Sequence, residues 1–257
     1  MNRFQKSMAL AAALAFSSVA SAEITSIKMG TEGAYPPFNS VDTNGNLVGF
    51  DIEIGNALCE AMKVECEWVT SDWDGIIPAL LAKKFDTILA SMSITEERKK
   101  KVAFSDKYYN TPAKFVTLKG SGLSIDAEGL KGKTIGVQSA TTHENFLRGE
   151  YDGVVEVKTY GTQDEANLDL ASGRVDAVLA DSVVMLDYLA SDAGKDAEFV
   201  GPEFSQVKYF GEGAGIAVRL EDEELLGMLN TALQQILEDG TYKAINAKYF
   251  DFNVYGD

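Results

Sequence analysis

The sequence predicts an α/β protein built from two similar lobes with a cleft between them. Short apolar runs alternate with segments of helical periodicity along most of the chain, which is typical of layered α/β sheets. One pattern also occurs twice, as KFDTILAS at 84–91 and as RVDAVLAD at 174–181. Each copy follows a helix rich in Leu and Ala, so two related α/β units are the simplest account. Chance likeness between two buried strands is the alternative.

Residues 1–22 have the features of a secretory signal peptide. Arg3 and Lys6 form a positive start, the apolar run that follows is too short to span a bilayer, and Ala20-Ser21-Ala22 supplies a small-residue cleavage site. No cysteine follows this site, and no later stretch is apolar enough to cross a membrane. We therefore expect an exported, soluble protein of 235 residues (257 − 22).

The chain is strongly acidic. Its 23 Lys and Arg against 39 Asp and Glu give a formal net charge of −16. Removal of the signal peptide with its two basic residues leaves 21 basic and 39 acidic residues, or −18. This charge argues against nucleic acid as a partner, because phosphates would be repelled. It favours cationic ligands only weakly, since many exported proteins are acidic for solubility alone.

Cys59 and Cys66 are the only cysteines. In an oxidising compartment, an isolated pair this close in sequence indicates one structural disulfide, here between the end of a helix over 51–62 and a strand over 66–69. Two thiols and one histidine are too few soft ligands for a closed metal site. A redox role would prefer a CxxC spacing. We expect no metal and no cofactor.

The mature chain opens with a strand over 26–30 that runs into a loop with Gly, two Pro and aromatic residues. Such a loop forms a tight connection at the end of a strand. Glu32 and Tyr35 are expected to face the cleft from it, whereas Phe38 is expected to pack beneath it. Packing of Tyr35 beneath the loop is the alternative.

A hairpin and two helices are predicted next. Asn44-Gly45 is a hairpin turn signal. The helix over 51–62 places apolar residues at i, i+4 and i+8, which forms a stripe that faces a core. After the strand that follows it, Asp74 is expected to cap a helix over 75–83, with Trp73 just ahead of it in the loop.

The stretch 86–98 gathers the first polar chemistry. A short buried strand ends in the small polar residues Ser91 and Ser93, and Thr95 is expected to cap a helix with Arg98 just inside it. Hydroxyls, free N–H groups and a guanidinium thus meet at a strand's carboxyl end, where open α/β sheets bind ligands. An Arg there can hold a carboxylate through two charge-assisted hydrogen bonds. A surface Arg on a polar loop is the alternative.

The second half of the chain repeats the alternation of strands and helices. A Gly-rich extended segment, 209–218, precedes the last two helices. The expected strands are 114–118, 134–138, 154–158 and 175–179, and the expected helices are about 144–148, about 163–172, one from 182, 222–238 and 241–248.

Two strand ends in this half also offer polar groups. The strand over 134–138 breaks into Ser139-Ala-Thr-Thr-His143 at a helix start, where unpaired N–H groups and the helix dipole favour an anion. Plain N-capping by Ser139 or Thr141 is the alternative, and capping and binding can coexist. Asp181 ends the second copy of the duplicated pattern, as Ser91 ends the first.

Together these residues fit an amino acid with a cationic side chain. Its α-carboxylate would meet Arg98 and the N–H groups of the Thr-rich helix start. Its α-ammonium would meet Asp181 and a serine. Its distal cation would meet Glu32, with Tyr35 and Trp73 packing on its methylenes.

Several motifs also resemble one known family. They are Gly49-Phe-Asp-Ile-Glu-Ile, the Cys59/Cys66 pair, Ser71-Asp-Trp-Asp-Gly-Ile-Ile-Pro78, Ser91-Met-Ser-Ile-Thr95 with Arg98, Phe104-Ser-Asp106 and Lys248-Tyr-Phe-Asp-Phe-Asn-Val-Tyr-Gly-Asp257. From about residue 26 to its end, the chain resembles the periplasmic lysine/arginine/ornithine- and histidine-binding proteins that feed ABC importers, a family of solute-binding proteins for polar amino acids.

The resemblance implies a two-lobed periplasmic binding protein fold (type II), each lobe a mixed sheet flanked by helices. The lobes are expected at 23–110 plus 213–257 and at 111–204, joined by two extended crossovers, the second at 205–212. The resemblance also implies a periplasmic monomer that has no catalytic residues, closes on its ligand and docks on an inner-membrane ABC permease. The ligand positions carried over are Glu32, Tyr35, Trp73, Ala90, Ser91, Ser93, Arg98, Gln138, Thr141, Thr142, His143 and Asp181, and we add Asn110 and Ser139.

At several of these ligand positions, the residue differs from the one that the lysine/arginine/ornithine binders have. These differences suggest a ligand larger or more polar than lysine. The extra donors suit an arginine derivative with a second carboxylate, as in octopine- and nopaline-binding proteins. We therefore predict an opine, octopine ahead of nopaline; free arginine, ornithine, lysine or histidine is the alternative. The departures are Glu32 for Asp, Trp73 for Phe, Ala90 for Ser, Gln138 for Leu, His143 for Gln and Asn110 for a small residue near the first crossover.

Two other classes of protein fit the sequence less well. Some relatives of this fold are exported enzymes, but the sequence has no Ser–His–acid spacing, no G-x-S-x-G elbow and no metal set. A receptor's sensor domain is disfavoured because no transmembrane segment is predicted. His143, the only histidine, invites a catalytic or pH-switch role, but beside a helix start we expect it at the edge of the ligand.

Overall fold

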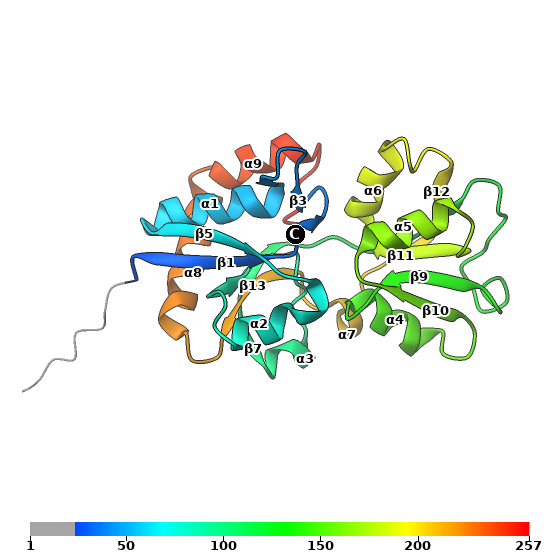
Figure 1. The fold of residues 1–257 in the computed structure, drawn as a ribbon, viewed down its shortest axis with the longest axis horizontal. Helices are drawn as coiled ribbons and strands as arrows, with labels where there is room; N and C mark the ends of the chain where they lie inside the picture. Colours follow the sequence, from blue (N-terminus) through cyan, green and yellow to red (C-terminus); the bar gives the residue numbers. More distant parts are fainter. Residues whose placement is uncertain (1–23, 257) are drawn as a thin grey trace, which may run out of the picture.

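The computed structural model describes residues 24–256. In this range, two lobes lie side by side, each with a five-stranded sheet and flanking helices (Figure 1). The predicted two-lobed α/β architecture is confirmed. The predicted signal peptide, residues 1–22, lies outside the described residues.

The first lobe contains a mixed sheet of order β5-β1-β6-β13-β7. β1 runs parallel to β5 and β6, whereas β13 lies antiparallel between β6 and β7. β13 therefore comes from a segment more than a hundred residues after the other strands of this sheet, where the chain returns to the first lobe after forming the second. The strands are β1 (Ser26–Thr31), β5 (Glu65–Thr70), β6 (Thr87–Ile88), β7 (Val102–Tyr109) and β13 (Ala214–Arg219).

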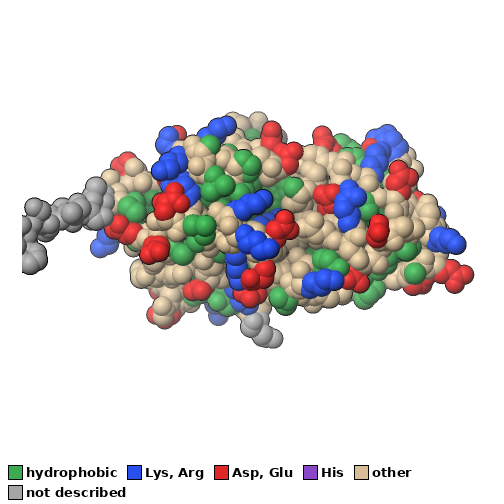
Figure 2. Space-filling view, turned by 90° about the horizontal axis from the view of Figure 1, so that it is seen from below, with side chains coloured by type: hydrophobic (Ala, Val, Ile, Leu, Met, Phe, Trp, Pro, Cys, Tyr) green, Lys and Arg blue, Asp and Glu red, His purple; other side chains and the backbone are tan. Residues whose placement is uncertain are grey.

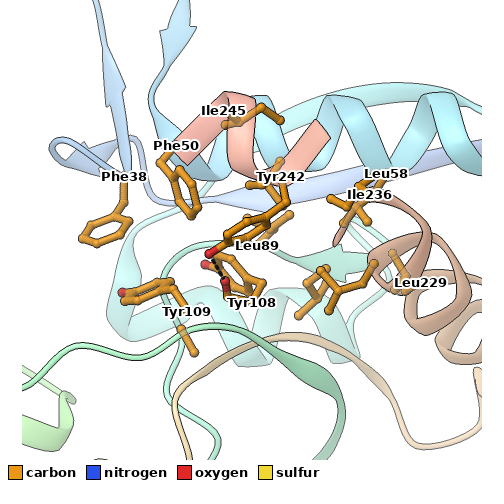
Figure 3. Packing of buried hydrophobic residues seen from close by; sticks show 14 of the residues in the cluster. Phe38, Phe50, Leu58, Leu89, Tyr108, Tyr109, Leu229, Ile236, Tyr242 and Ile245 are labelled. Carbon is orange, nitrogen blue, oxygen red and sulfur yellow. Dashed lines mark hydrogen bonds between the residues drawn. The ribbon is translucent and has the colours of Figure 1, made fainter. Parts of the chain in front are cut away.

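Helices cover both faces of this sheet. Helices α1 (Phe50–Met62), α8 (Glu223–Glu238) and α9 (Thr241–Tyr249) pack together over one core, and α2 (Ile76–Leu81) packs over a second core on the opposite face. In the larger core, rings and aliphatic side chains from α1, β7, α8 and α9 converge (Figure 3). Phe38 is fully buried there and stacks on Tyr109 with ring centroids 4.4 Å apart, so its predicted packing beneath the loop is confirmed.

The second lobe has a mixed sheet of order β10-β9-β11-β8-β12. β9 runs parallel to β10 and β11, and β8 runs antiparallel to β11 and β12. Helix α4 packs with a core on one side of the sheet, and α5 and α6 pack with a core on the other. The elements are β8 (Ala113–Leu118), β9 (Thr134–Gln138), α4 (Thr142–Glu150), β10 (Glu156–Tyr160), α5 (Gln163–Ala171), β11 (Ala177–Asp181), α6 (Ser182–Ala190) and β12 (Ala197–Phe204).

Two crossovers connect the lobes. The first joins β7 to β8 through residues 110–112, and the second joins β12 to β13. We expected the second crossover to be extended over 205–212, but it contains a short helix, α7 (Val207–Phe210), which contacts α4. The strands of the first sheet lie within 23–110 and 213–257, and those of the second lie within 111–204.

Smaller predicted features are also present. Asn44-Gly45 lies in the turn between β3 (Asn39–Val41) and β4 (Leu47–Val48), which pair antiparallel beside β2 (Ala34–Tyr35). Cys59 and Cys66 form a disulfide that joins α1 to β5, so this prediction is confirmed.

The duplicated sequence pattern has a structural basis. In the first lobe, the carboxylate of Asp86 accepts from the N–H of Lys28 at 2.9 Å, and the N–H of Asp86 donates to the carbonyl of Lys28 at 2.8 Å. In the second lobe, Asp176 makes the same two bonds to Thr134, at 2.9 and 2.8 Å. Each aspartate therefore fixes the start of its strand against the neighbouring strand.

Some local predictions were wrong. Asp74 does not cap a helix; it lies inside a 3₁₀ turn, η1 (Trp73–Gly75), and α2 begins after Gly75 without a side-chain cap. Strands β7 and β12 were missed because their sequences mix apolar with charged and small residues. In contrast, Thr95 and Thr141 cap α3 (Glu96–Lys99) and α4.

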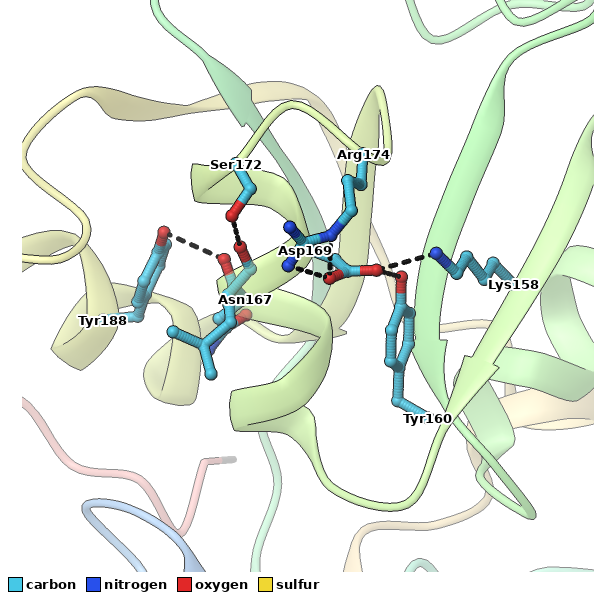
Figure 4. Close-up of polar contacts among 8 residues, drawn as sticks. Lys158, Tyr160, Asn167, Asp169, Ser172, Arg174 and Tyr188 are labelled. Carbon is cyan, nitrogen blue, oxygen red and sulfur yellow. Dashed lines mark hydrogen bonds and ion pairs between the residues drawn. The ribbon is translucent and has the colours of Figure 1, made fainter.

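In the second lobe, a cluster of charges surrounds Asp169 on α5 (Figure 4). Its carboxylate accepts from Lys158 at 2.7 Å, from Tyr160 at 2.6 Å and from Arg174 at 2.6 Å. These donors hold the pKa of Asp169 well below its usual range, with the Lys158 hydrogen bond as the largest cause. The cluster ties β10 and the turn before β11 to α5.

We expect Asp169→Asn to lower the melting temperature by about 3 °C at pH 7. Because the folded-state pKa of Asp169 is lowered, its contribution to stability is fully present above the unfolded pKa of about 4 and is lost progressively as pH falls from there through the lower folded-state pKa, so it is smaller at pH 3 than at pH 7. Thermal unfolding at pH 7 and pH 3 measures this. Equal destabilisation of the variant at both pH values would contradict it.

Acidic and basic side chains intermingle over the face of the molecule seen from below, with basic side chains gathered near its middle (Figure 2). In the part of the chain that the structure describes, no helix combines the length and the apolar character needed to cross a bilayer.

Candidate ligand-binding site

Two adjoining cavities lie between the lobes. One is the outer cavity, and the other is the inner cavity, which lies beside the crossovers. They share Tyr35, Ser91, Ser93, Thr142 and His143. The outer cavity is also lined by Glu32, Trp73, Ala90, Arg98, Gln138 and Thr141, and the inner one by Tyr109, Asn110, Thr111, Ala113, Asp181, Phe210, Gly213 and Ala214.

All but one of the predicted site residues therefore lie around these two cavities. The exception is Ser139, which is in neither lining; its N–H donates to the carbonyl of Tyr160 at 2.8 Å. Residues of both crossovers were missed by the sequence prediction. Thr111 and Phe210 are examples. The only signal in the sequence that could have identified them is their proximity to the expected hinges.

Glu32 and Gln138 meet across the cleft at one end of the outer cavity. The amide nitrogen of Gln138 donates to Glu32 Oε1 at 2.6 Å and to the carbonyl of Gly161 at 3.1 Å. Burial raises the pKa of Glu32 to about 7, although the Gln138 hydrogen bond opposes this shift. A cation placed beside this carboxylate would restore its ionised form.

Arg98, a residue of the first lobe, also lines the outer cavity and contacts the second lobe. Its guanidinium donates to the carbonyl of Ser93 at 3.0 Å and to that of Ala140 at 3.3 Å, and it lies 5.3 Å from the centroid of the Trp73 ring. Burial lowers the pKa of Arg98 to about 10, so it remains a cation at neutral pH. Both acceptors are neutral carbonyls, which a carboxylate can outcompete.

The N-terminus of α4 faces the same space. Thr141 caps this helix by accepting from the N–H of Glu144 at 3.2 Å, and Thr142 and His143 form the first turn. The first N–H groups of a helix have no partner within the helix, and the helix dipole favours an anion there. The Arg98 guanidinium and this helix end, which come from opposite lobes, thus present donors of the kind that an anion requires.

Asp181 ends β11 and caps α6. Its carboxylate accepts from the N–H of Val183 at 2.8 Å and of Val184 at 3.4 Å, and the hydroxyl of Thr111 donates to its other oxygen. Burial raises the pKa of Asp181 to about 6. No ion pair to Asp181 occurs among the described residues.

His143 lies between the two cavities, with its ring 5.7 Å from that of Phe210. Burial, together with the nearby charge of Arg98, lowers the pKa of His143 to about 3. The imidazole is therefore neutral at physiological pH. Among the described residues, no cluster of His, Cys, Asp and Glu is arranged to hold a metal ion.

Residues 27–252 match the family of bacterial extracellular solute-binding proteins, family 3. The chain belongs to this family. It is 50% identical to an L-arginine-binding protein of Pseudomonas aeruginosa over 98% of this chain and 99% of that protein. It is 44% identical to a lysine/arginine/ornithine-binding periplasmic protein of Escherichia coli over 90% of each. Among solved structures, an ancestral arginine-binding protein bound to arginine is 43% identical, with a TM-score of 0.80 over 88% of this chain and 98% of that one.

This solute-binding protein thus has the type II periplasmic binding protein fold that the resemblance implied. Behind Ser91, it has a buried polar network around Asp51 at the start of α1. The Asp51 carboxylate accepts from Tyr108 at 2.8 Å, from Asn39 at 2.8 Å and from Ser91 at 3.0 Å. Ser91 has a φ of 54°, an unusual backbone for a residue other than glycine. The network holds the serine in this conformation at the cavity wall.

Proposed function

We propose that this solute-binding protein captures L-arginine, and other cationic L-amino acids less tightly, in the periplasm for an ABC importer. The observation that supports this most is the arrangement of charge around the two cavities. Arg98 is the only Lys or Arg in their described linings, and Glu32 and Asp181 are two acids without an ion pair among the described residues. An amino acid with one carboxylate and two cationic groups complements this arrangement.

In the proposed pose, the α-carboxylate binds Arg98 and the start of α4, and the α-ammonium binds Asp181. The side chain extends past Trp73, and its cation meets Glu32. Each charge-assisted hydrogen bond contributes about 1.5–3 kcal/mol net. Three or four of them support roughly micromolar or tighter binding after the cost of association. The names of the relatives at 50% and 44% identity support the same ligand class.

Gln138 favours arginine over lysine in this pose. Because its amide nitrogen already donates to Glu32 and to the Gly161 carbonyl, the group left for a ligand is its carbonyl oxygen. With the Glu32 carboxylate, the end of the cavity then offers only acceptors. A guanidinium has five N–H donors in a planar fork and satisfies two such neighbouring acceptors better than an ammonium does.

A thermal-shift panel on protein stripped of ligand tests the proposal. A ligand with a Kd of about 1 μM, added at 1 mM, stabilises by about 4 kcal/mol and raises the melting temperature by about 8–16 °C. We expect this shift for L-arginine, smaller shifts for L-ornithine, L-lysine and L-histidine, and none for D-arginine. No shift with any cationic L-amino acid would contradict the proposed function.

The opine hypothesis stays a prediction. The observation in its favour is the inner cavity, which adjoins Asp181 and Asn110 and offers space beyond the α-nitrogen, where octopine has its second carboxylate. Against it, the Gln138 amide donors are engaged, and the neutral His143 supplies no cation. Free arginine is therefore the better-supported ligand.

Closure and delivery are part of the proposal. Contacts already cross the cleft, since Gln138 bonds Glu32 and the Trp73 indole N–H donates to the Ala140 carbonyl at 3.4 Å. A ligand held by both lobes stabilises the closed form by its differential contacts, and the closed protein, as a monomer, docks on the permease. The relatives described above are named as binding proteins, and we propose no catalytic turnover for this chain.

Glu32→Gln is expected to raise the Kd for L-arginine about 10- to 100-fold at pH 8, because a charge-assisted bond becomes a neutral one. The raised pKa of Glu32, about 7, means that the wild-type affinity increases as pH rises through 7 and Glu32 ionises. The variant should lack this increase and keep only the rise of about twofold that comes from Asp181, whose pKa is about 6. Calorimetry between pH 6 and 8 measures both effects.

L-citrulline, whose side chain is neutral, provides the control for Glu32→Gln. Its Kd should change far less than that of L-arginine. Equal losses for the two ligands would show that Glu32 does not contact the distal cation.

A further inference from the structure

Thr111 lies in the first crossover, at the point where the hinge meets the binding site. It comes two residues before Ala113, which pairs with Asp181 in the antiparallel ladder of β8 and β11. This register brings the crossover alongside the start of α6. There the Thr111 hydroxyl donates to Asp181 Oδ2, and the carbonyl of Pro112 accepts from the N–H of Ser182 at 2.8 Å.

The Pro112 bond attaches the hinge to the backbone at the start of α6, and the Thr111 bond attaches it to the carboxylate that is expected to receive the ligand's α-ammonium. The other oxygen of Asp181, Oδ1, is taken by the N–H groups of Val183 and Val184. Oδ2, the oxygen bonded to Thr111, is therefore the one left to share with a ligand. Thr111 also lines the inner cavity together with Asp181, so its hydroxyl reaches the carboxylate from the side of the cavity where the ligand is proposed to bind.

Around Asp181, the described residues that line the inner cavity supply no cation to keep it ionised. The titratable groups that face it are Tyr35 from β2, Tyr109 from β7 and His143 from α4. Burial raises the pKa values of both tyrosines well above 10 and lowers that of His143 to about 3, so all three are neutral. Among the described residues that line the inner cavity, none is a lysine or an arginine.

Hydrogen bonds alone therefore offset the cost of burying the Asp181 charge. Burial raises the pKa of Asp181 to about 6, and of the bonds that lower it, the one from Thr111 is the largest. A donor that bonds the ionised carboxylate favours that form over the protonated one. Loss of this donor would leave the acid protonated at a higher pH, and a protonated acid cannot pair with an ammonium.

We propose that Thr111 is a positioning residue for ligand capture: from the hinge, its hydroxyl holds the Asp181 carboxylate ionised and oriented for the ligand's α-ammonium. The inference rests on the proposed function. It adds a residue of the crossover to the machinery that recognises the ligand, although Thr111 itself need not touch the ligand.

The test compares L-arginine with 5-guanidinopentanoate, the same molecule without the α-amino group, by calorimetry from pH 5 to 8. The titration of Glu32 affects both ligands, so the ratio of the two Kd values isolates Asp181. In the wild type, the advantage of L-arginine should fall as pH drops through about 6. In Thr111→Val, the midpoint of this fall should lie roughly one pH unit higher, which weakens L-arginine binding about fivefold at pH 6 and much less at pH 8.

Conservative and alternative variants complete the experiment. Thr111→Ser keeps the hydroxyl and should restore the wild-type midpoint, and Thr111→Ala should behave as Thr111→Val does. A midpoint that does not move, or Kd values that rise equally for both ligands, would overturn the inference while leaving the proposed function intact. Failure of the wild-type protein to bind L-arginine would overturn the proposed function itself.

Discussion

Arg98→Met is expected to cause a large loss of affinity for L-arginine. The guanidinium is the only cationic side chain in the described lining of the two cavities, and its present partners, the carbonyls of Ser93 and Ala140, are neutral. Leaving a ligand carboxylate without its partner in a buried site costs about 3–5 kcal/mol, which corresponds to a rise in Kd of more than about a hundredfold. Calorimetric titration with L-arginine measures it.

Two controls separate binding from folding in this experiment. Arg148→Met removes an arginine from the exposed side of α4, where it pairs with Glu144, and should leave the Kd unchanged. Agmatine, which is arginine without its carboxylate, should bind the wild type weakly and Arg98→Met equally weakly. If Arg98→Met binds L-arginine within tenfold of the wild type, the carboxylate lies elsewhere.

Asp181→Asn is expected to have the second large effect. The substitution keeps the shape of the side chain and its capping position at the start of α6, but it removes the charge that the α-ammonium needs. Loss of one partner of a buried charge pair costs about 2–5 kcal/mol, so the Kd for L-arginine should rise about 30-fold or more. Titration at pH 8, where Asp181 is ionised in the wild type, gives the full effect.

Asp176→Asn is the matched control for Asp181→Asn, because it lies just before the same strand. Asp176 fixes β11 against Thr134 and pairs with Lys133 at 2.9 Å, away from both cavities. This variant should lower the melting temperature and leave the Kd nearly unchanged. The opposite pattern, with affinity lost at residue 176 and kept at 181, would contradict the proposed pose.

The sequence predicted best where local chemistry decides the structure. Thr95 and Thr141 cap helices because a hydroxyl accepts from an N–H in the first turn. Ser91 and Asp181 come together because each stands five residues after an aspartate that fixes the start of its strand. Helix caps and strand ends of this kind can be recognised in a single sequence because they depend on neighbouring residues. The duplicated pattern then assigned Ser91 and Asp181 to two different lobes.

The sequence predicted less well where distant segments decide the structure. Strand β7 exists because β13, more than a hundred residues later, pairs with it. The fully buried Asp51 resembles an ordinary residue of a helix's first turn, and its role behind Ser91 depends on Asn39 and Tyr108 from other elements. Thr111 was missed for the same reason, because its contact with Asp181 spans 70 residues.

The most direct measurement is a calorimetric titration of ligand-stripped wild-type protein with L-arginine and with octopine at pH 8. The account predicts micromolar or tighter binding of L-arginine at one site per chain, and much weaker binding of octopine. Tight binding of octopine with L-arginine silent would contradict it, and would show that the inner cavity beside Asp181 and Asn110 receives a second carboxylate.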